Sequence, residues 1–200
     1  MNLATATTFL PPMRQLFASL ALLPLALAAQ NNLTPAPPSA IKWVSLAEAQ
    51  ANVKKAPKPI MIDVYTHWCG PCKMLASKTF TDPKLAEYVN KNFYAVKFDA
   101  ESGEEVTFNG KTYKNPTFNP AMKTGRNGTH ELTQAIGSVE GRIAYPTVVY
   151  MNENLEIIAP VQGYMTPEQI EPILKYIGEG AYKKQDFPSY KAGFTGAWVP

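Results

Sequence analysis

The feature that most constrains this chain is a pair of cysteines, Cys69 and Cys72, separated only by Gly70 and Pro71. An apolar run over residues 60–65 precedes them and predicts a buried strand, and helix-forming residues follow to about residue 78. The two intervening residues bring the cysteines together across the first turn of that helix, close enough for a disulfide. We therefore expect a strand, a cysteine-containing turn and a helix in direct succession.

The start of a helix favours a reactive thiolate at Cys69. Backbone N–H groups without partners and the positive end of the helix dipole stabilise negative charge at this position. Thiolates attack disulfides, so Cys69 is our candidate nucleophile, and Cys72, one turn further and expected to be more buried, is the candidate resolving thiol. A structural disulfide and half of a metal site are the alternatives. The flanking Trp68 and the Gly-Pro between the cysteines favour redox chemistry over both.

Composition narrows the class of protein. Two cysteines in 200 residues are too few for a four-cysteine zinc site or for a scaffold built on disulfides. The chain is 46% hydrophobic and 18% charged, which fits a folded domain with an apolar core. Its net charge is only +3 and no run of lysine or arginine occurs, so we expect no nucleic-acid partner. We also expect no metal and no cofactor.

The first 40 residues predict an export signal and a linker. Arg14 is the one charged residue among residues 1–40, and residues 16–29 are mostly apolar and contain the small-x-small pattern Ala26-Leu27-Ala28. We predict a signal peptide over residues 1–29, with Met1 and Met13 both possible starts, and a flexible proline-rich linker over residues 30–40. A folded domain over residues 41–180 and an aromatic tail over residues 181–200 complete the chain.

Strands and helices alternate through the folded part, which predicts an α/β fold around a mixed sheet. Expected helices cover residues 45–55, 71–78, 82–90, 130–136 and 166–177, and expected strands cover residues 60–65, 93–98, 147–151 and 155–161. Pro172 should kink or shorten the last helix. Residues 101–128 are polar, and Asn109-Gly110 within them predicts a tight hairpin.

The run Trp68-Cys69-Gly70-Pro71-Cys72-Lys73 resembles the active-site motif of the thioredoxin superfamily. The resemblance implies a thioredoxin fold, a mixed central sheet flanked by helices, with an insertion at about residues 101–128 before the cis-proline segment. Asp63 matches the buried acid that accepts a proton from the resolving cysteine, and a carboxylate inside an apolar strand should have a raised pKa. Tyr145-Pro146-Thr147 matches the cis-proline segment that pairs with substrate backbone. Gly163 matches a glycine beside the substrate groove and equally fits an ordinary turn.

Four further features of the sequence concern the site, the insertion and the tail. His67 precedes the motif, where an imidazolium would favour the thiolate, or where the ring simply faces solvent. Lys97 is a candidate counterpart of the lysine near the buried acid. The acidic residues of the insertion, with His130, are expected to be solvated rather than metal ligands. The aromatic tail is expected to pack on the domain as a strap, with partner binding as the alternative.

These features together predict an exported thiol:disulfide oxidoreductase, similar to exported bacterial thioredoxin-like proteins and to the C-terminal domains of membrane disulfide-interchange reductases. The Gly-Pro pair resembles reducing thioredoxins, with a potential near about −270 mV against about −120 mV for a strong periplasmic oxidant. We therefore expect reduction of disulfides in exported proteins, supplied by a membrane thiol-electron donor because the bacterial periplasm is oxidising. The alternatives are a disulfide oxidase or isomerase and a non-catalytic binding module.

Overall fold

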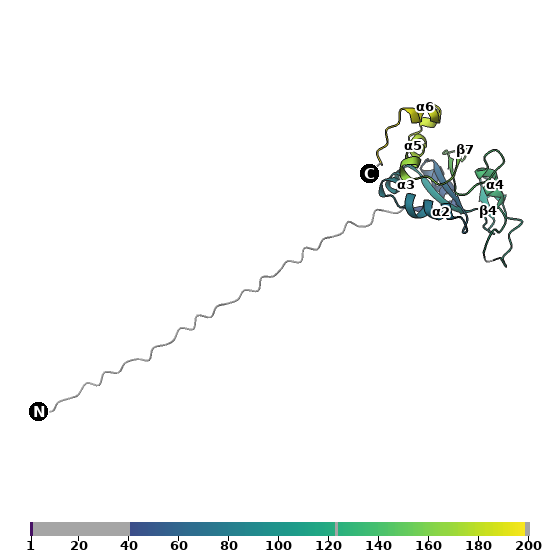
Figure 1. The fold of residues 1–200 in the computed structure, drawn as a ribbon, viewed down its shortest axis with the longest axis horizontal. Helices are drawn as coiled ribbons and strands as arrows, with labels where there is room; N and C mark the ends of the chain where they lie inside the picture. The colour runs from purple at the N-terminus through teal and green to yellow at the C-terminus, as the bar shows by residue number, and fades with distance from the viewer. Residues whose placement is uncertain (2–40, 123, 199–200) are drawn as a thin grey trace. The chain divides into compact units, whose positions relative to one another are not determined.

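The computed structural model of the chain describes Met1 and residues 41–122 and 124–198 (Figure 1). The predicted signal peptide over residues 1–29 and the predicted linker over residues 30–40 lie, except for Met1, outside the described residues.

A five-stranded mixed sheet forms the centre of the domain. Its strands run in the order β1 (Trp43–Val44), β3 (Tyr94–Asp99), β2 (Ile60–Tyr65), β6 (Thr147–Met151) and β7 (Ile157–Gln162). The first three are parallel, whereas β6 is antiparallel to β2 and β7 is antiparallel to β6. The central strand β2 is buried along almost its whole length, as its apolar run, interrupted only by Asp63, predicts.

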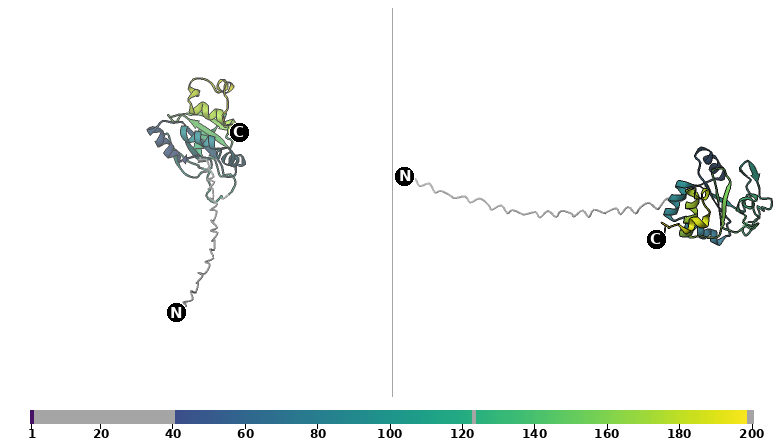
Figure 2. Two further views of the ribbon diagram at one scale, coloured as in Figure 1. Left: turned by 90° about the vertical axis from the view of Figure 1, so that its left-hand side faces the viewer. Right: turned by 90° about the horizontal axis from the view of Figure 1, so that it is seen from above.

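Helices cover both faces of this sheet (Figure 2). The helices α1 (Leu46–Lys55) and α4 (Glu131–Gly137) share a core cluster with Ile60, Ile62 and Val64 of β2. The helices α3 (Pro83–Asn92) and α5 (Pro167–Gly178) share the second cluster with Met61, on the opposite face. Side chains alternate along a strand, so Asp63 lies on the same face as Met61. The α/β thioredoxin fold predicted from the sequence is thus confirmed.

The helix after the cysteines consists of α2 (Gly70–Met74) followed by a single π-helical turn, η1 (Leu75–Thr79). It therefore reaches about as far as predicted, but its second half is not a regular α-helix.

The last helix departs from its prediction. α5 continues unbroken from Pro167 to Gly178 through Pro172, so the expected shortening is wrong. Pro172 is buried, and the packing of its ring offsets the hydrogen bond that its missing N–H cannot make.

The polar insertion contains the predicted hairpin, β4 (Val106–Phe108) and β5 (Lys111–Tyr113). Asn109 and Gly110 have positive φ values of 48° and 78°, which a turn of this type requires at both central positions. The Gln50 side chain on α1 donates to the Thr107 carbonyl at 3.0 Å and accepts from the Asn109 N–H at 2.9 Å. The hairpin is therefore fastened to α1, and in Figure 1 it lies beside α4.

His130 fixes the end of the insertion. It is fully buried, caps α4 by accepting the Leu132 N–H at Nδ1, and its Nε2 lies 2.9 Å from the Glu104 carbonyl. Its role in the structure is a helix cap, so the expectation that His130 is solvated is wrong.

The aromatic tail contains η2 (Ala181–Lys183) and α6 (Phe187–Ala192) and packs on α5. Tyr176 of α5 contacts the rings of Tyr182, Phe187 and Tyr190. The buried Glu171 carboxylate accepts the backbone N–H groups of Ala197 and Trp198, and the Trp198 ring, 7% exposed, packs against Tyr88. Residues 181–198 thus form the strap that the sequence led us to expect.

Candidate active site

The two cysteines lie where β2 ends and α2 begins. Cys69 is the N-cap residue of α2, and its sulfur is joined to that of Cys72 in a disulfide, with 5.3 Å between the two Cα atoms. The Cys69 Sγ also accepts the backbone N–H of Cys72 at 3.0 Å. The same N–H, in the reduced protein, is placed to stabilise a thiolate on Cys69. The strand, turn and helix follow one another as the motif predicts.

The burial of the two cysteines does not differ as predicted. Cys69 is 3% exposed and Cys72 is 5% exposed, so the expectation that Cys72 is the more buried of the two is wrong for this disulfide form. The reason is that each sulfur covers the other, and the Cys72 N–H covers the Cys69 sulfur further. Sequence position on a helix gives no information about this mutual shielding.

Asp63 lies under the cysteines, in the middle of β2. It is 2% exposed, and it lines a cavity of about 160 Å³ together with Cys72, Lys73 and Lys97. Burial raises the pKa of the Asp63 carboxyl above its ordinary value, and the positive charge of Lys97 partly opposes this rise. The Lys97 Nζ lies 3.4 Å from the Asp63 Oδ2, while Oδ1 receives no hydrogen bond from a described residue.

Lys97 occupies this place because β2 and β3 pair in parallel with Asp63 opposite Lys97. Its ammonium also lies over the rings of Trp43 and Tyr65, at 5.1 and 5.2 Å from their centroids. The lysine is thus held beside the acid by two aromatic rings.

The Tyr145–Pro146 peptide bond is cis and leads directly into β6 at Thr147. Gly163, just after β7, has a φ of 104° and donates its N–H to the Pro146 carbonyl at 2.8 Å. The Tyr145 ring meets the Trp68 ring edge-on, with 5.8 Å between the centroids. The two predicted substrate-binding segments are therefore next to each other, and Tyr145 connects them to the cysteine motif.

The Trp68 ring, 37% exposed, is held by residues of the insertion. Its Nε1–H donates to the Glu101 Oε2 at 2.9 Å, and the Arg126 guanidinium lies 4.8 Å from its ring centroid. The Asn127 backbone N–H donates to the same Glu101 oxygen at 3.1 Å. The Glu101 Oε2 therefore holds both Trp68 and Asn127, which lies near the C-terminal end of the insertion.

The remaining motif residues lie around the disulfide. His67 is largely exposed, with its Nε2 3.3 Å from the Asp99 Oδ2 and its ring edge-on to Tyr65. Pro71 is in the first turn of α2, where its missing N–H removes no hydrogen bond. A Cβ on Gly70 would meet no atom within 4 Å, so crowding does not require glycine there.

Glu101, Arg126 and Asn127 belong to the site although the sequence did not predict them there. All three are part of a polar segment without periodicity, and their contact with Trp68 depends on the path of the loop. The one available signal is that Glu101 comes just after the end of β3, at the same edge of the sheet as the motif after β2.

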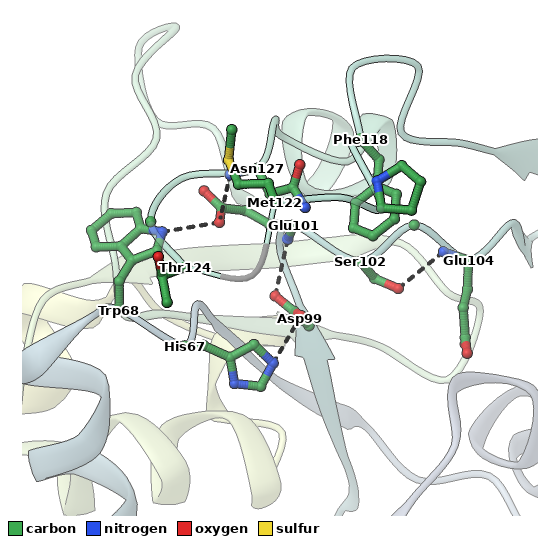
Figure 3. Close-up of a pocket in the computed structure, with 13 residues that line it drawn as sticks. His67, Trp68, Asp99, Glu101, Ser102, Glu104, Phe118, Met122, Thr124 and Asn127 are labelled. Atoms are coloured by element: carbon green, nitrogen blue, oxygen red, sulfur yellow. Dashed lines mark hydrogen bonds and ion pairs between the residues drawn. The ribbon is translucent and has the colours of Figure 1, made fainter.

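A larger cavity of about 680 Å³ lies between the motif and the insertion (Figure 3). His67, Trp68 and Asp99 border it on the side of the sheet. The described residues that border it on the side of the insertion are Glu101, Ser102, Gly103, Glu104, Phe118, Pro120, Met122, Thr124, Gly125 and Asn127. A neighbouring cavity of about 310 Å³ is lined by Trp68, Arg126 and Tyr145, among others. The Trp68 ring is a wall of both.

Neither a metal site nor a membrane span occurs in the described part of the chain. No cluster of three or more histidine, cysteine, aspartate or glutamate residues there has an arrangement able to hold a metal ion. No helix among the described residues combines the length and apolar character needed to cross a membrane.

Fold and site together define a thioredoxin-type domain, and comparison with known proteins places it in a family. The sequence model of the Thioredoxin-like domain family matches residues 46–178. The chain is 46% identical over 37 residues to the thioredoxin of Acidithiobacillus ferridurans, covering 18% of this chain and 34% of that protein. It is 32% identical over 47 residues to the thiol:disulfide interchange protein DsbD of Pectobacterium atrosepticum, covering 24% of this chain and 8% of that protein.

Among solved structures, a thioredoxin-fold protein from Helicobacter pylori matches with a TM-score of 0.45 and 19% identity, covering 72% of this chain and 91% of that one. The chain spans about a third or less of the length of the two curated relatives named above. The match to the family model covers most of the chain, so this protein belongs to the Thioredoxin-like domain family.

Proposed function

We propose that this chain is an exported thiol:disulfide oxidoreductase that reduces disulfides of extracytoplasmic proteins. The observation that carries the proposal is the disulfide at the start of α2, with Cys72 and the buried Asp63 lining one cavity behind it. The likeness to a thiol:disulfide interchange protein supports this chemistry. Export is supported by the apolar residues 16–29 and the Ala26-Leu27-Ala28 pattern.

The reaction starts from the reduced protein. The Cys69 thiolate attacks one sulfur of a substrate disulfide, so a Cys69–substrate disulfide forms and the other substrate sulfur leaves as a thiolate, which takes up a proton. Asp63 accepts the proton of Cys72, directly or through water in the shared cavity. The Cys72 thiolate then attacks the Cys69 sulfur, which restores the Cys69–Cys72 disulfide and releases the second substrate thiol.

Each cycle therefore transfers two electrons from the protein to the substrate. A membrane thiol-electron donor must return these electrons by reducing the Cys69–Cys72 disulfide, because the bacterial periplasm supplies no reducing buffer. Tyr145, Pro146 and Thr147 are the proposed binding segment for substrate backbone, with Gly163 beside them. Trp68, His67, Gly70, Pro71 and Lys73 surround the disulfide as the flanking residues of the active site.

Insulin reduction with dithiothreitol tests the activity. We expect the folded chain to accelerate the reduction above the rate with dithiothreitol alone, and Cys69→Ser to return the rate to that background. No acceleration by the wild-type protein would reject the enzyme and favour a binding module with a static disulfide.

Equilibration with glutathione tests the direction. We expect a potential closer to about −270 mV than to about −120 mV, as the Gly70-Pro71 pair indicates. A potential near the upper value would overturn the assignment as a reductase and favour an oxidase.

A further inference from the structure

We propose that the 680 Å³ cavity between the motif and the insertion binds a lysine or arginine side chain of the substrate, next to the reacting cysteine. The inference rests on the proposed function and adds a substrate class to it. We call this cavity the insertion pocket; its described lining residues are His67, Trp68, Asp99, Glu101, Ser102, Gly103, Glu104, Phe118, Pro120, Met122, Thr124, Gly125 and Asn127.

The insertion pocket has an apolar side. Phe118 is 38% exposed and Met122 is 44% exposed, and Pro120 lines the pocket near them. Large apolar side chains left open to solvent beside a reactive group indicate a surface that another molecule covers. A cavity of this size is within the range of about 300–1,000 Å³ that is usual for ligand sites, and it accommodates one long side chain easily.

The pocket also has an acidic side. Asp99, Glu101 and Glu104 contribute acidic side chains, of which Asp99 has its Oδ2 3.3 Å from the Nε2 of the lining residue His67, and no described lining residue is a lysine or an arginine. Arg126 does not offset them there, because its guanidinium stacks on the Trp68 ring and lines the neighbouring cavity. Apolar walls with carboxylates beside them match a lysine or arginine side chain, which has an apolar stem and a charged end.

The carboxylates are held in place by the surrounding backbone. The Asp99 Oδ1 accepts the Glu101 N–H at 3.0 Å. The hydrogen bonds from Trp68 and Asn127 both go to the Glu101 Oε2, and no described residue donates a hydrogen bond to Oε1. Figure 3 shows the Glu101 and Asp99 carboxylates near the centre of the pocket, with Trp68 and His67 on one side and Phe118 on the other.

The position of the pocket limits which substrate residue can reach it. Trp68 is directly before Cys69 in the sequence, and its ring separates the insertion pocket from the cavity lined by Tyr145. A substrate bonded to Cys69 and paired with the cis-proline segment therefore passes Trp68. A strand advances about 3.3 Å per residue, so the side chain that enters the pocket comes from a residue close to the substrate cysteine.

Reduction of three model peptides tests the proposal. Each is a disulfide-linked dimer of one short peptide with a single cysteine, flanked on both sides by lysine, alanine or glutamate. The reduced protein is mixed with each dimer, the reaction is quenched with acid, and free peptide thiol is measured by chromatography. Each rate constant is divided by the rate constant of the same dimer with dithiothreitol, which removes the effect of the flanking charge on the disulfide itself.

We expect the lysyl dimer to react about five-fold faster than the glutamyl dimer after this correction, the equivalent of about 1 kcal/mol for a partly exposed ion pair. Added salt should reduce the ratio. Glu101→Gln combined with Glu104→Gln should bring the ratio close to one. Glu105→Gln combined with Glu140→Gln, which removes the same two negative charges from the exposed ion pairs with Lys114 and Arg142 outside the pocket, should leave both the ratio and the activity unchanged.

Equal corrected rates for the three dimers, or a faster glutamyl dimer, would overturn the pocket proposal while the proposed function stands. The pocket proposal also fails if the control Glu105→Gln/Glu140→Gln reduces the ratio as much as Glu101→Gln/Glu104→Gln, because the preference would then come from overall charge. Failure to reduce even the alanyl dimer would reject the proposed function, and the pocket proposal with it.

Discussion

Replacing Asp63 by asparagine should stabilise the domain at neutral pH and slow its reaction. The carboxyl is 2% exposed, and burial raises its pKa, so the ionised form is disfavoured in the folded protein. In the unfolded chain the group ionises near its ordinary pKa of 3.8. The free energy of unfolding of the wild-type protein therefore falls as the pH rises from that value through the raised pKa, and the variant lacks this loss.

The size of the gain follows from the contacts of Asp63. Asparagine removes the buried negative charge: the ionised carboxylate loses its hydration in the folded protein, and Oδ1 has no partner among the described residues to replace it, which costs about 1–3 kcal/mol. The ion pair with Lys97, whose side chain is 36% exposed, offsets at most about 1 kcal/mol. Asparagine keeps the shape of the side chain, so no cavity forms. We expect the variant to be more stable by about 1–2 kcal/mol, or about 3–6 °C in Tm.

Urea unfolding of the oxidised proteins measures this difference. The gain should be present at about pH 7 and absent at about pH 3, below the ordinary pKa of aspartate. Asp99→Asn, at a partly exposed carboxylate at the end of the next strand, should change stability by no more than about 0.5 kcal/mol. A less stable Asp63→Asn protein at neutral pH, or an equal gain at both pH values, would refute the reasoning. Insulin reduction by the variant should fall at least about ten-fold, because the proton acceptor for Cys72 is lost.

Three further predictions test other parts of the structure. Glu101→Ala should speed the exchange of the Trp68 indole N–H with solvent about five-fold, whereas Glu101→Gln, which keeps an acceptor, should not; equal exchange in both would argue against the hydrogen bond. Trp198→Ala should lower the free energy of unfolding by about 3 kcal/mol in urea, and an unchanged value would mean that the strap does not stabilise the domain. Gly163→Ala should cost at least about 1 kcal/mol because φ is 104° there, while Gly70→Ala should change stability by about 0.5 kcal/mol or less. Similar losses at the two glycines would contradict the backbone argument.

Local sequence signals predicted most of the fold because each acts over a few residues. The apolar run of β2 predicts a buried strand wherever it is placed, and Asn109-Gly110 supplies the positive φ values of its turn without help from the rest of the chain. Asp63 could be placed near the cysteines because it is in the strand that leads to them. The contact between Lys97 and Asp63 could not be predicted in this way, because it depends on the register between β2 and β3.

Local signals predict the hairpin of the insertion but not the path of the loop that follows it. Arg126 contacts Trp68, and Asn127 contacts Glu101, only because this loop returns from the hairpin, and no periodic pattern encodes that path. The prediction that Cys72 is more buried than Cys69 was also wrong, because the relative burial depends on the state of the cysteine pair rather than on the position in the helix. The prediction that Pro172 shortens α5 was wrong for a third reason, because tertiary packing outweighs the local preference of proline against a helix interior.

The central claim is that Cys69 is the nucleophile and Cys72 the resolving thiol, and replacing each cysteine in turn tests it most directly. Reduced Cys72→Ser and reduced Cys69→Ser proteins are each mixed with insulin and quenched with acid, and covalent adducts are identified by mass before and after dithiothreitol. We predict that Cys72→Ser accumulates an insulin adduct through Cys69 that dithiothreitol releases, and that Cys69→Ser forms little or none. Equal adducts from both variants, or an adduct only with Cys69→Ser, would contradict the assignment of Cys69 as the nucleophile.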